Sequence, residues 1–185
     1  MTEEQRTLRI LKMPSFYDYI AYLQFLPSSV MGPGLDYSDY ISFINMEKQY
    51  FNIPNPIKAV LSSLGASLIC LAVYLFIYLP YFPVEFMTTS TYLTWNGWKM
   101  YFYSFISVTL IRFKYYFAWK LNSCAIDACG LSYEKTITNP NGKQEHIFSR
   151  NANVNILTVE GTKNVRDKIS NWNIPVQSWL EKCVY

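Results

Sequence analysis

Long apolar segments alternate with short polar ones along the chain. No charged residue occurs between Ala59 and Val84, and residues 59–79 alone form an uncharged run of 21 residues. A helix of that length extends about 31 Å at 1.5 Å per residue, which matches the ~30 Å hydrocarbon core of a bilayer. A buried helix of a large soluble core is the weaker interpretation. The pattern therefore predicts a membrane-spanning helix that is ended by Pro80 and Pro83.

A second long run, from Trp98 to Cys129, contains neither glycine nor proline and lies between Gly97 and Gly130. As one helix its 32 residues would extend about 48 Å, which is more than a bilayer needs. We therefore expect this helix to tilt, to kink or to project from the membrane.

The segment before the predicted span is aromatic and is interrupted by polar residues. Asp18 and Pro27 break the apolar run of residues 14–31, which favours a short or re-entrant segment over a full span. Residues 31–34 (Met-Gly-Pro-Gly) predict a turn. Residues 36–44 mix aromatic and acidic side chains, which is typical of a helix at the membrane interface.

The remainder of the chain is more polar. Residues 132–170 are hydrophilic, with a turn signal at residues 139–142, and an amphipathic helix is expected to begin near Asn173. Its apolar stripe follows the spacing i, i+4, i+7, i+8 and i+11: Trp172, Val176, Trp179, Leu180 and Cys183. The expected fold class is all-α, a polytopic integral membrane protein with a re-entrant or interfacial segment and a polar cytoplasmic loop.

Composition and charge agree with a membrane protein. Half of the residues (51%) are hydrophobic and 16% are charged, against roughly 25% charged in soluble domains. The net charge of +3 is too small and too diffuse to indicate a nucleic-acid partner. Lys and Arg occur in residues 1–58 and 132–171 but not in residues 83–98, so the positive-inside rule predicts that both basic flanks are cytoplasmic. The four cysteines lack metal-ligand spacing and are expected to be free thiols.

The long helix carries one polar and aromatic stripe. Steps of four, three, four and four place five residues on one face: Arg112, Tyr116, Trp119, Ser123 and Asp127. A cation within a membrane helix costs at least ~2.5 kcal/mol unless it faces protein, water or an anion. Arg112 could therefore line a cavity that receives a phosphate. It could equally extend to the cytoplasmic interface, with the tyrosines as belt residues, and spacing leaves both interpretations open.

Asn173 lies beside the apolar stripe of the last helix, two residues before Pro175. An amide can orient a group or donate a hydrogen bond but cannot take a proton at neutral pH. Spacing alone favours an N-cap, with Pro175 opening the helix. The single histidine, His146, lies in the most polar part of the chain without a metal ligand nearby, so we expect it in a surface loop. The sequence has no nucleophile elbow, P-loop, dinucleotide fingerprint or paired-carboxylate motif.

Three segments, taken in order, resemble the membrane-bound O-acyltransferase superfamily and in particular its lysophospholipid acyltransferase branch. Residues 14–40 look like the family's aromatic membrane segment with a Gly-Pro turn and a spaced aromatic box. Residues 112–119 (Arg-Phe-Lys-Tyr-Tyr-Phe-Ala-Trp) are similar to its basic-aromatic box. Residues 153–156 (Asn-Val-Asn-Ile), followed by Glu160 and by Trp-Asn at residues 172–173, resemble its asparagine box. The succession of these boxes covers nearly the whole chain.

The resemblance implies a reaction and roles for particular residues. An acyl group would pass from acyl-CoA, a co-substrate rather than a cofactor, to a lysophospholipid hydroxyl, with Asn173 as a catalytic residue that orients a histidine or holds an oxyanion. The residues implied in substrate binding are Arg112, Lys114, Tyr115, Tyr116, Trp119 and Trp172. The two cations would face CoA or lipid phosphates, and the aromatic residues of the long helix would line a lipid tunnel. Membrane lipids would be partners, whereas nucleic acid and metal would not.

The family's Trp-His-Gly histidine and its first membrane helices have no counterpart in the sequence. We therefore expect residues 1–185 to be the central part of a single acyltransferase domain, inactive on its own, from a multi-pass protein of the endoplasmic reticulum. Two alternatives remain open at this point. One is a non-catalytic membrane scaffold or lipid-binding module of the same fold, and the other is an O-acyltransferase that acts on a sterol or a protein.

Overall fold

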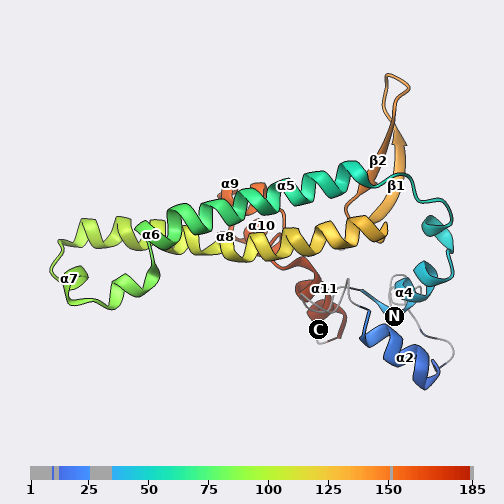
Figure 1. Ribbon diagram of the computed structural model, residues 1–185, viewed down its shortest axis with the longest axis horizontal. Coiled ribbons are helices and arrows are strands. Elements are labelled where there is room, and N and C mark those ends of the chain that lie inside the picture. The colour runs from blue at the N-terminus through green and yellow to red at the C-terminus, as the bar shows by residue number, and fades with distance from the viewer. Residues whose placement is uncertain (1–9, 11–12, 26–34, 151, 184–185) are drawn as a thin grey trace. The chain divides into compact units, whose positions relative to one another are not determined.

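The computed structural model describes residue 10 and residues 13–25, 35–150 and 152–183 (Figure 1). It divides the chain into two compact units, one made of residues 1–63 and 122–185 and the other of residues 64–121. The turn expected at residues 31–34 lies outside the described residues, as does the second half of the expected re-entrant segment.

The predicted membrane span is confirmed as a helix. The α-helix α5 (Ile57–Val73) continues through a π-helical turn (Tyr74–Tyr78) into α6 (Leu79–Tyr81). Within the described residues, Ile57–Thr88 is the one helical segment long and apolar enough to cross a membrane, and 11% of its most apolar window is buried. Because a core helix of a soluble protein would be mostly buried, the exposed apolar side chains are suited to contact lipid.

The helix ends at Tyr81, two residues beyond the predicted end at Leu79. Pro80 lies within the last helical turn, directly after the π-helical turn, and Phe82 N still donates to Tyr78 O at 2.9 Å. Proline lacks the N–H that would reach back four residues, and locally wider turns of this kind accommodate the missing bond. Pro83 then follows the end of the helix, as the sequence predicts.

The segment between the two long helices folds around aromatic side chains. It contains a 3₁₀-helix (Val84–Thr88) and the single turn α7 (Ser90–Leu93). Tyr103 Oη donates to Pro83 O at 2.9 Å, and the Tyr92 and Ser104 hydroxyls lie 2.7 Å apart. Rings of Phe86, Tyr92, Trp95 and Tyr103 pack with centroids 5.3–6.3 Å apart. This aromatic cluster packs the connection together, and the Lys99 ammonium lies over its Trp95 ring, 3.8 Å from the ring centroid.

The second long run forms one continuous helix, α8 (Gly97–Cys129), as predicted (Figure 1). Its C-terminus is a Schellman motif: Leu131 N donates to Ile126 O at 3.1 Å and Gly130 N to Asp127 O at 2.9 Å, with Gly130 at φ +79°. The helix carries charged residues along its length and is not among the apolar spans found in the described part of the chain. The multi-pass topology therefore stays a prediction.

The all-α expectation is wrong for the polar segment that follows α8. Strands β1 (Tyr133–Thr138) and β2 (Gln144–Phe148) pair antiparallel, with Thr136 opposite His146. The turn that joins them lies at the predicted place, where Gly142 adopts φ +73°. Most side chains of this hairpin are exposed on both faces, so the sequence lacks the apolar–polar alternation by which a half-buried strand is recognised. His146 is exposed as expected, although on a strand rather than in a loop.

Five further α-helices are described: α2 (Phe16–Leu23), α4 (Tyr37–Ile44), α9 (Ile156–Gly161), α10 (Val165–Ser170) and α11 (Ile174–Cys183). A 3₁₀-helix (Lys48–Asn52) follows α4. The interfacial helix expected at residues 36–44 corresponds to α4, and the final amphipathic helix corresponds to α11. In the described half of the expected re-entrant segment, the chain forms the short helix α2, and whether this segment enters the membrane stays a prediction.

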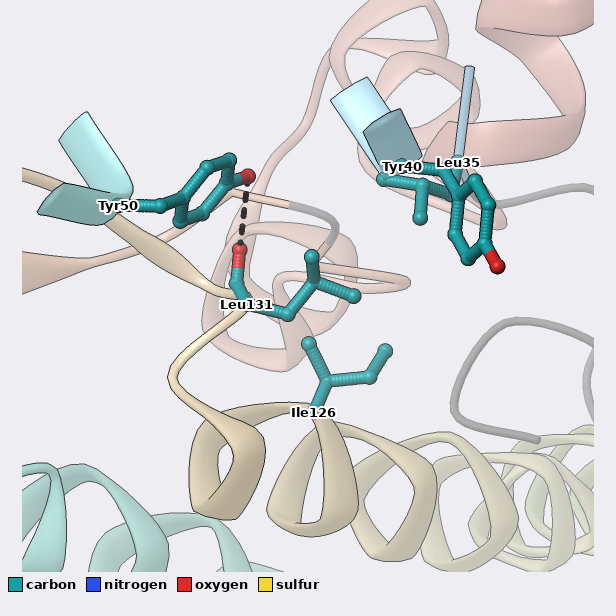
Figure 2. Close-up of a cluster of buried hydrophobic side chains, with 5 residues drawn as sticks. All are labelled: Leu35, Tyr40, Tyr50, Ile126 and Leu131. Carbon is teal, nitrogen blue, oxygen red and sulfur yellow. Dashed lines mark hydrogen bonds between the residues drawn. The ribbon is translucent and has the colours of Figure 1, made fainter. Parts of the chain in front are cut away.

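A small core holds the unit of residues 1–63 and 122–185 together (Figure 2). It consists of the buried side chains Leu35, Tyr40, Tyr50, Ile126 and Leu131. Tyr50 Oη donates to Leu131 O at 3.3 Å, and Leu131 and Ile126 are also the residues of the Schellman motif that ends α8. The end of the long helix is thus fixed by the same side chains that pack α4 and the 3₁₀-helix.

Candidate functional site: a bridge between two asparagine segments

Two short segments rich in asparagine meet in an isolated antiparallel bridge between Val154 and Trp172. Asn155 N donates to Asn171 O at 3.2 Å, and Ile174 N donates to Asn153 O at 3.0 Å. Between these two bonds the first segment has one residue and the second has two. The second segment therefore contains a bulge, a device that redirects side chains and is common beside active sites. We refer to this pairing as the asparagine bridge.

Asn173 is the extra residue of the bulge. Its φ of +51° is left-handed, and it shares a positive φ with only two other non-glycine residues in the described part of the chain. Asparagine tolerates this region better than most residues, whereas a Cβ-branched side chain would be strained there. Asn173 O accepts from Gln177 N at 3.2 Å, so the residue is held between the bridge and the first turn of α11.

Asn173 occupies the predicted N-cap position, but its side chain does not make the hydrogen bond of an N-cap. Asn173 directly precedes α11, and Pro175 lies in the first turn, as expected. The side-chain Oδ1 is buried but has no hydrogen-bond partner among the described residues, so it does not accept from the helix N-terminus. Asn155 and Asn164 show true capping in the same unit, since their Oδ1 atoms accept from Thr158 N and Arg166 N. The left-handed backbone of Asn173 explains the difference, because an N-cap residue normally has an extended φ and ψ.

Two more buried amide atoms without partners belong to this region. Asn153 is only 5% exposed, and its Nδ2 has no partner among the described residues. Gln177, one turn into α11, donates from Nε2 to Glu181 Oε1 at 3.2 Å, and its buried Oε1 is unpartnered. Sequence reasoning did not select either residue as a site residue. The available signal was the spacing of Asn153 within the asparagine box, whereas nothing in the sequence marks Gln177.

Trp172 lies next to Asn173 and provides the apolar side of the bridge. It is half-buried, and its bridge partner Val154 is buried. Trp172 N donates to Ile169 O at 3.1 Å, which connects the bridge to the end of α10. The two predicted site residues of the asparagine box are neighbours in the sequence, and the bridge pairs Trp172 with Val154 of the first asparagine segment.

The other predicted site residues lie on α8 within the unit of residues 64–121. Tyr116 and Trp119 are buried, Arg112 is half-buried, and Lys114 and Tyr115 are exposed. The rings of Tyr115 and Trp119 lie 6.0 Å apart, and those of Phe113 and Tyr116 lie 5.5 Å apart. Burial of Tyr116 and Trp119 shows that these two members of the stripe face protein, while the roles in substrate binding of all five residues stay predictions.

The last residue of that stripe, Asp127, is hydrogen-bonded to two serine side chains. Its buried carboxylate accepts from Ser63 Oγ at 2.6 Å and from Ser132 Oγ at 2.5 Å. These bonds connect the end of α8 to α5 and to the segment that precedes β1. Both carboxylate oxygens of Asp127 thus have partners that hold these segments together.

Electrostatics in the core also connect distant segments. Arg150 Nη2 lies 2.5 Å from Asp39 Oδ2 on α4, and Arg150 is close enough to Tyr50 to affect its phenol. Burial raises the pKa of Tyr50 above its usual value, and the Arg150 guanidinium opposes part of that rise. Arg150 immediately precedes the segment that enters the asparagine bridge, so this ion pair fixes where that segment begins.

Comparison with known proteins confirms the resemblance to the acyltransferase family. The family model described as "MBOAT, membrane-bound O-acyltransferase family" matches residues 2–185. Lysophospholipid acyltransferase 6 of Drosophila melanogaster is 31% identical over 204 residues, covering 100% of this chain and 27% of its own length. Lysophospholipid acyltransferase 2 of Arabidopsis thaliana is 30% identical and membrane-bound glycerophospholipid O-acyltransferase 1 of Homo sapiens is 29% identical, each over 100% of this chain.

The chain spans about two fifths or less of the length of these relatives: 27%, 40% and 39%. Within that span the family match is continuous from residue 2 to residue 185, so it includes both α8 and the asparagine bridge. The chain belongs to the membrane-bound O-acyltransferase family.

Proposed function

We propose that this protein transfers an acyl group from acyl-CoA to the free hydroxyl of a lysophospholipid, and that residues 1–185 contribute part of the active site. The supporting observation is the asparagine bridge. Asn173 lies in a bulge with a left-handed backbone, and its amide oxygen is buried without a partner. Unsatisfied buried groups and sparsely populated backbone conformations concentrate at functional sites, because a merely structural residue would gain stability by avoiding both.

In this proposal the Asn173 amide acts on the reacting groups without exchanging a proton. It would orient a histidine that takes the proton of the lipid hydroxyl, or hydrogen-bond the oxyanion that forms at the thioester carbonyl. The histidine would come from a part of the protein outside these residues, because His146 lies exposed on β2 with its Nδ1 bonded to Thr136 Oγ1 at 2.8 Å. Asn173 would thus act as one of a pair of catalytic residues, together with that histidine.

The basic and aromatic residues of α8 are proposed to bind the substrates. Arg112 and Lys114 would form charge-assisted hydrogen bonds with phosphates of CoA or of the lipid. Tyr115, Tyr116 and Trp119 would line the path of an acyl chain, and Trp172 would contact substrate beside Asn173. Since both substrates carry an acyl chain and a phosphate, a helix that carries both aromatic rings and cations is suited to either.

We also propose that the protein is a multi-pass protein of the endoplasmic reticulum. Arg and Lys lie on both sides of the α5–α8 segment but not in the connection between Pro83 and Trp98, which supports a cytoplasmic location for both flanks. Acyl-CoA would then approach from the cytoplasm, whereas the lipid would enter from the membrane.

The test is an acyl-transfer assay with membranes that contain the protein expressed from its whole reading frame. Labelled oleoyl-CoA would be offered with lysophospholipids of choline, ethanolamine, serine and inositol, and with cholesterol and an acyl-accepting peptide as alternative acceptors. We expect a labelled diacyl phospholipid from at least one lysophospholipid. Label in the sterol ester or the peptide alone would assign a different acceptor, and membrane insertion without any transfer would identify a non-catalytic module.

Residues 1–185 expressed alone provide the comparison in the same assay. The proposed general base is not among them, so we expect no turnover above that of control membranes. Robust turnover by residues 1–185 would overturn the proposal that Asn173 needs a histidine from another part of the protein.

A further inference from the structure

The asparagine bridge contains two pairs of amides that differ in whether their hydrogen bonds are satisfied. Asn155 and Asn171 flank the bridge on one side, and both are used locally: Asn155 Oδ1 accepts from Thr158 N, and Asn171 Nδ2 donates to Asp167 O at 2.9 Å. Asn153 and Asn173 flank it on the other side, where Asn153 Nδ2 and Asn173 Oδ1 are buried without partners. The same residue type is therefore satisfied on one side and unsatisfied on the other.

Unsatisfied buried amides are costly. Each such group loses its hydrogen bonds to water on folding, at a cost of about 1–3 kcal/mol. Gln177 Oε1 is a third such atom in the same region, and the Nε2 of the same amide donates to Glu181 Oε1 at 3.2 Å. Three unpartnered amide atoms within one bridge and one helical turn indicate that the bridge is built to receive a polar group from outside these residues.

The chemistry of the unpartnered atoms limits what that group can be. Asn153 offers a donor, while Asn173 and Gln177 offer acceptors. A phosphate or carboxylate provides acceptors only, and an ammonium group provides donors only, so each would leave part of the set unsatisfied. A hydroxyl both donates and accepts, and it would satisfy Asn153 Nδ2 and one of the two acceptors at the same time.

We propose that Asn153, Asn173 and Gln177 line one subsite that binds the free hydroxyl of the lysophospholipid. This proposal rests on the proposed function and adds Asn153 and Gln177 to the substrate-binding residues. Asn153 Nδ2 donates a hydrogen bond to the hydroxyl oxygen, and Asn173 Oδ1 or Gln177 Oε1 accepts a hydrogen bond from the hydroxyl group, whose proton passes to the histidine only in the reaction. The Ile174 N–Asn153 O and Gln177 N–Asn173 O hydrogen bonds, at 3.0 and 3.2 Å, keep the three residues in one place.

The subsite can be tested by binding in the absence of acyl-CoA, so that no chemistry is required. Protein from the whole reading frame would be purified in detergent and titrated with 1-oleoyl lysophospholipids of the four head groups above. Each would be compared with its 2-deoxy analogue, in which hydrogen replaces the glycerol hydroxyl. We expect at least one lysophospholipid to bind about tenfold or more tightly than its analogue, because the analogue leaves buried amides unpaired.

Substitutions then assign the preference to this subsite. Asn153→Leu and Gln177→Met keep approximate size but remove hydrogen-bonding groups, so we expect the preference for the hydroxyl to fall to within about threefold of unity in Asn153→Leu and to decrease in Gln177→Met. Asn153→Asp is the conservative variant, which keeps the shape and replaces the donor by an acceptor, and should behave like Asn153→Leu. Asn155→Ser, which preserves the cap on α9, is the matched control and should retain the full preference.

Each outcome bears on the proposal. Equal binding of every lysophospholipid and its analogue by the wild type overturns it, and so does a full preference that survives in both Asn153 variants. The latter result would indicate that a group of the protein's own chain occupies the subsite. A protein that prefers the hydroxyl but transfers no acyl group supports the subsite and refutes the proposed function. A protein that transfers acyl groups but keeps its preference for the hydroxyl in these variants supports the proposed function and refutes the subsite.

Discussion

Asp39 and Arg150 lie 111 residues apart in the sequence and form an ion pair in which Nη2 and Oδ2 are separated by 2.5 Å. Asp39 is on α4, and Arg150 follows β2, with its backbone N–H donating to Ser132 O at 3.1 Å. The pair therefore joins the aromatic segment near the N-terminus to the segment that enters the asparagine bridge.

Removing one partner of this pair should destabilise the protein more than removing both. The Asp39 side chain is 13% exposed and that of Arg150 is 34% exposed, so solvent screens the interaction only in part. We expect Asp39→Asn or Arg150→Gln to cost about 1–2 kcal/mol, because each leaves a buried charge uncompensated, while the double variant recovers part of the loss. Thermal unfolding in detergent measures the effect, and Lys135→Gln at the exposed Lys135–Glu134 pair should leave the midpoint unchanged. Additive single effects would show that the pair is not coupled.

Gly130 should be the glycine least tolerant of a side chain in the described part of the chain. A Cβ at Gly130 would lie 2.8 Å from Ile53 Cγ2 and 3.0 Å from Cδ1, and the backbone has φ +79°. Gly130→Ala should therefore cost about 2–4 kcal/mol, combining left-handed strain with overpacking.

Two other glycines separate these contributions. Gly142→Ala has the positive φ but nothing within 4 Å, and Gly161→Ala has neither problem. The unfolding midpoint should fall most in Gly130→Ala, less in Gly142→Ala and least in Gly161→Ala. Equal effects at Gly130 and Gly142 would mean that Ile53 moves aside freely.

Part of this fold could be predicted from the sequence because long helices leave clear patterns in composition. The absence of Gly and Pro from Trp98 to Cys129 predicted α8, and the uncharged run from Ala59 predicted α5. The β1–β2 hairpin was missed because it is exposed on both faces and has no alternation. Asn173 was found by resemblance, but its bulge depends on pairing with a segment about twenty residues away, and no local pattern encodes that register. The unpartnered atoms of Asn153 and Gln177 are likewise a property of the folded chain.

The orientation in the membrane is open to a direct test. The positive-inside rule places the connection between α6 and α8 in the lumen and the β1–β2 hairpin in the cytoplasm. With the four native cysteines replaced by serine, Thr91→Cys and Asn141→Cys would report on exposed positions of α7 and of the hairpin turn. In sealed microsomes an impermeant maleimide should label Asn141→Cys at once and Thr91→Cys only after permeabilisation. The opposite pattern would reverse the orientation, and immediate labelling of both would argue against a crossing by α5.

Substitutions at Asn173 can distinguish a structural role from a chemical one, because the amide can be removed with or without adding backbone strain. Asn173→Gly keeps the left-handed φ without strain and removes the amide, whereas Asn173→Ala removes the amide and adds strain. If the amide acts on the reacting groups, both variants should lose about 10²-fold or more in turnover, on the scale of deleting an oxyanion-hole donor. If the residue only permits the bulge, Asn173→Gly should retain near-normal turnover while Asn173→Ala unfolds at lower temperature. Measuring acyl transfer and the unfolding midpoint of both variants, in the protein expressed from its whole reading frame, distinguishes the two. A stable but inactive Asn173→Gly supports catalysis, and an active one refutes it.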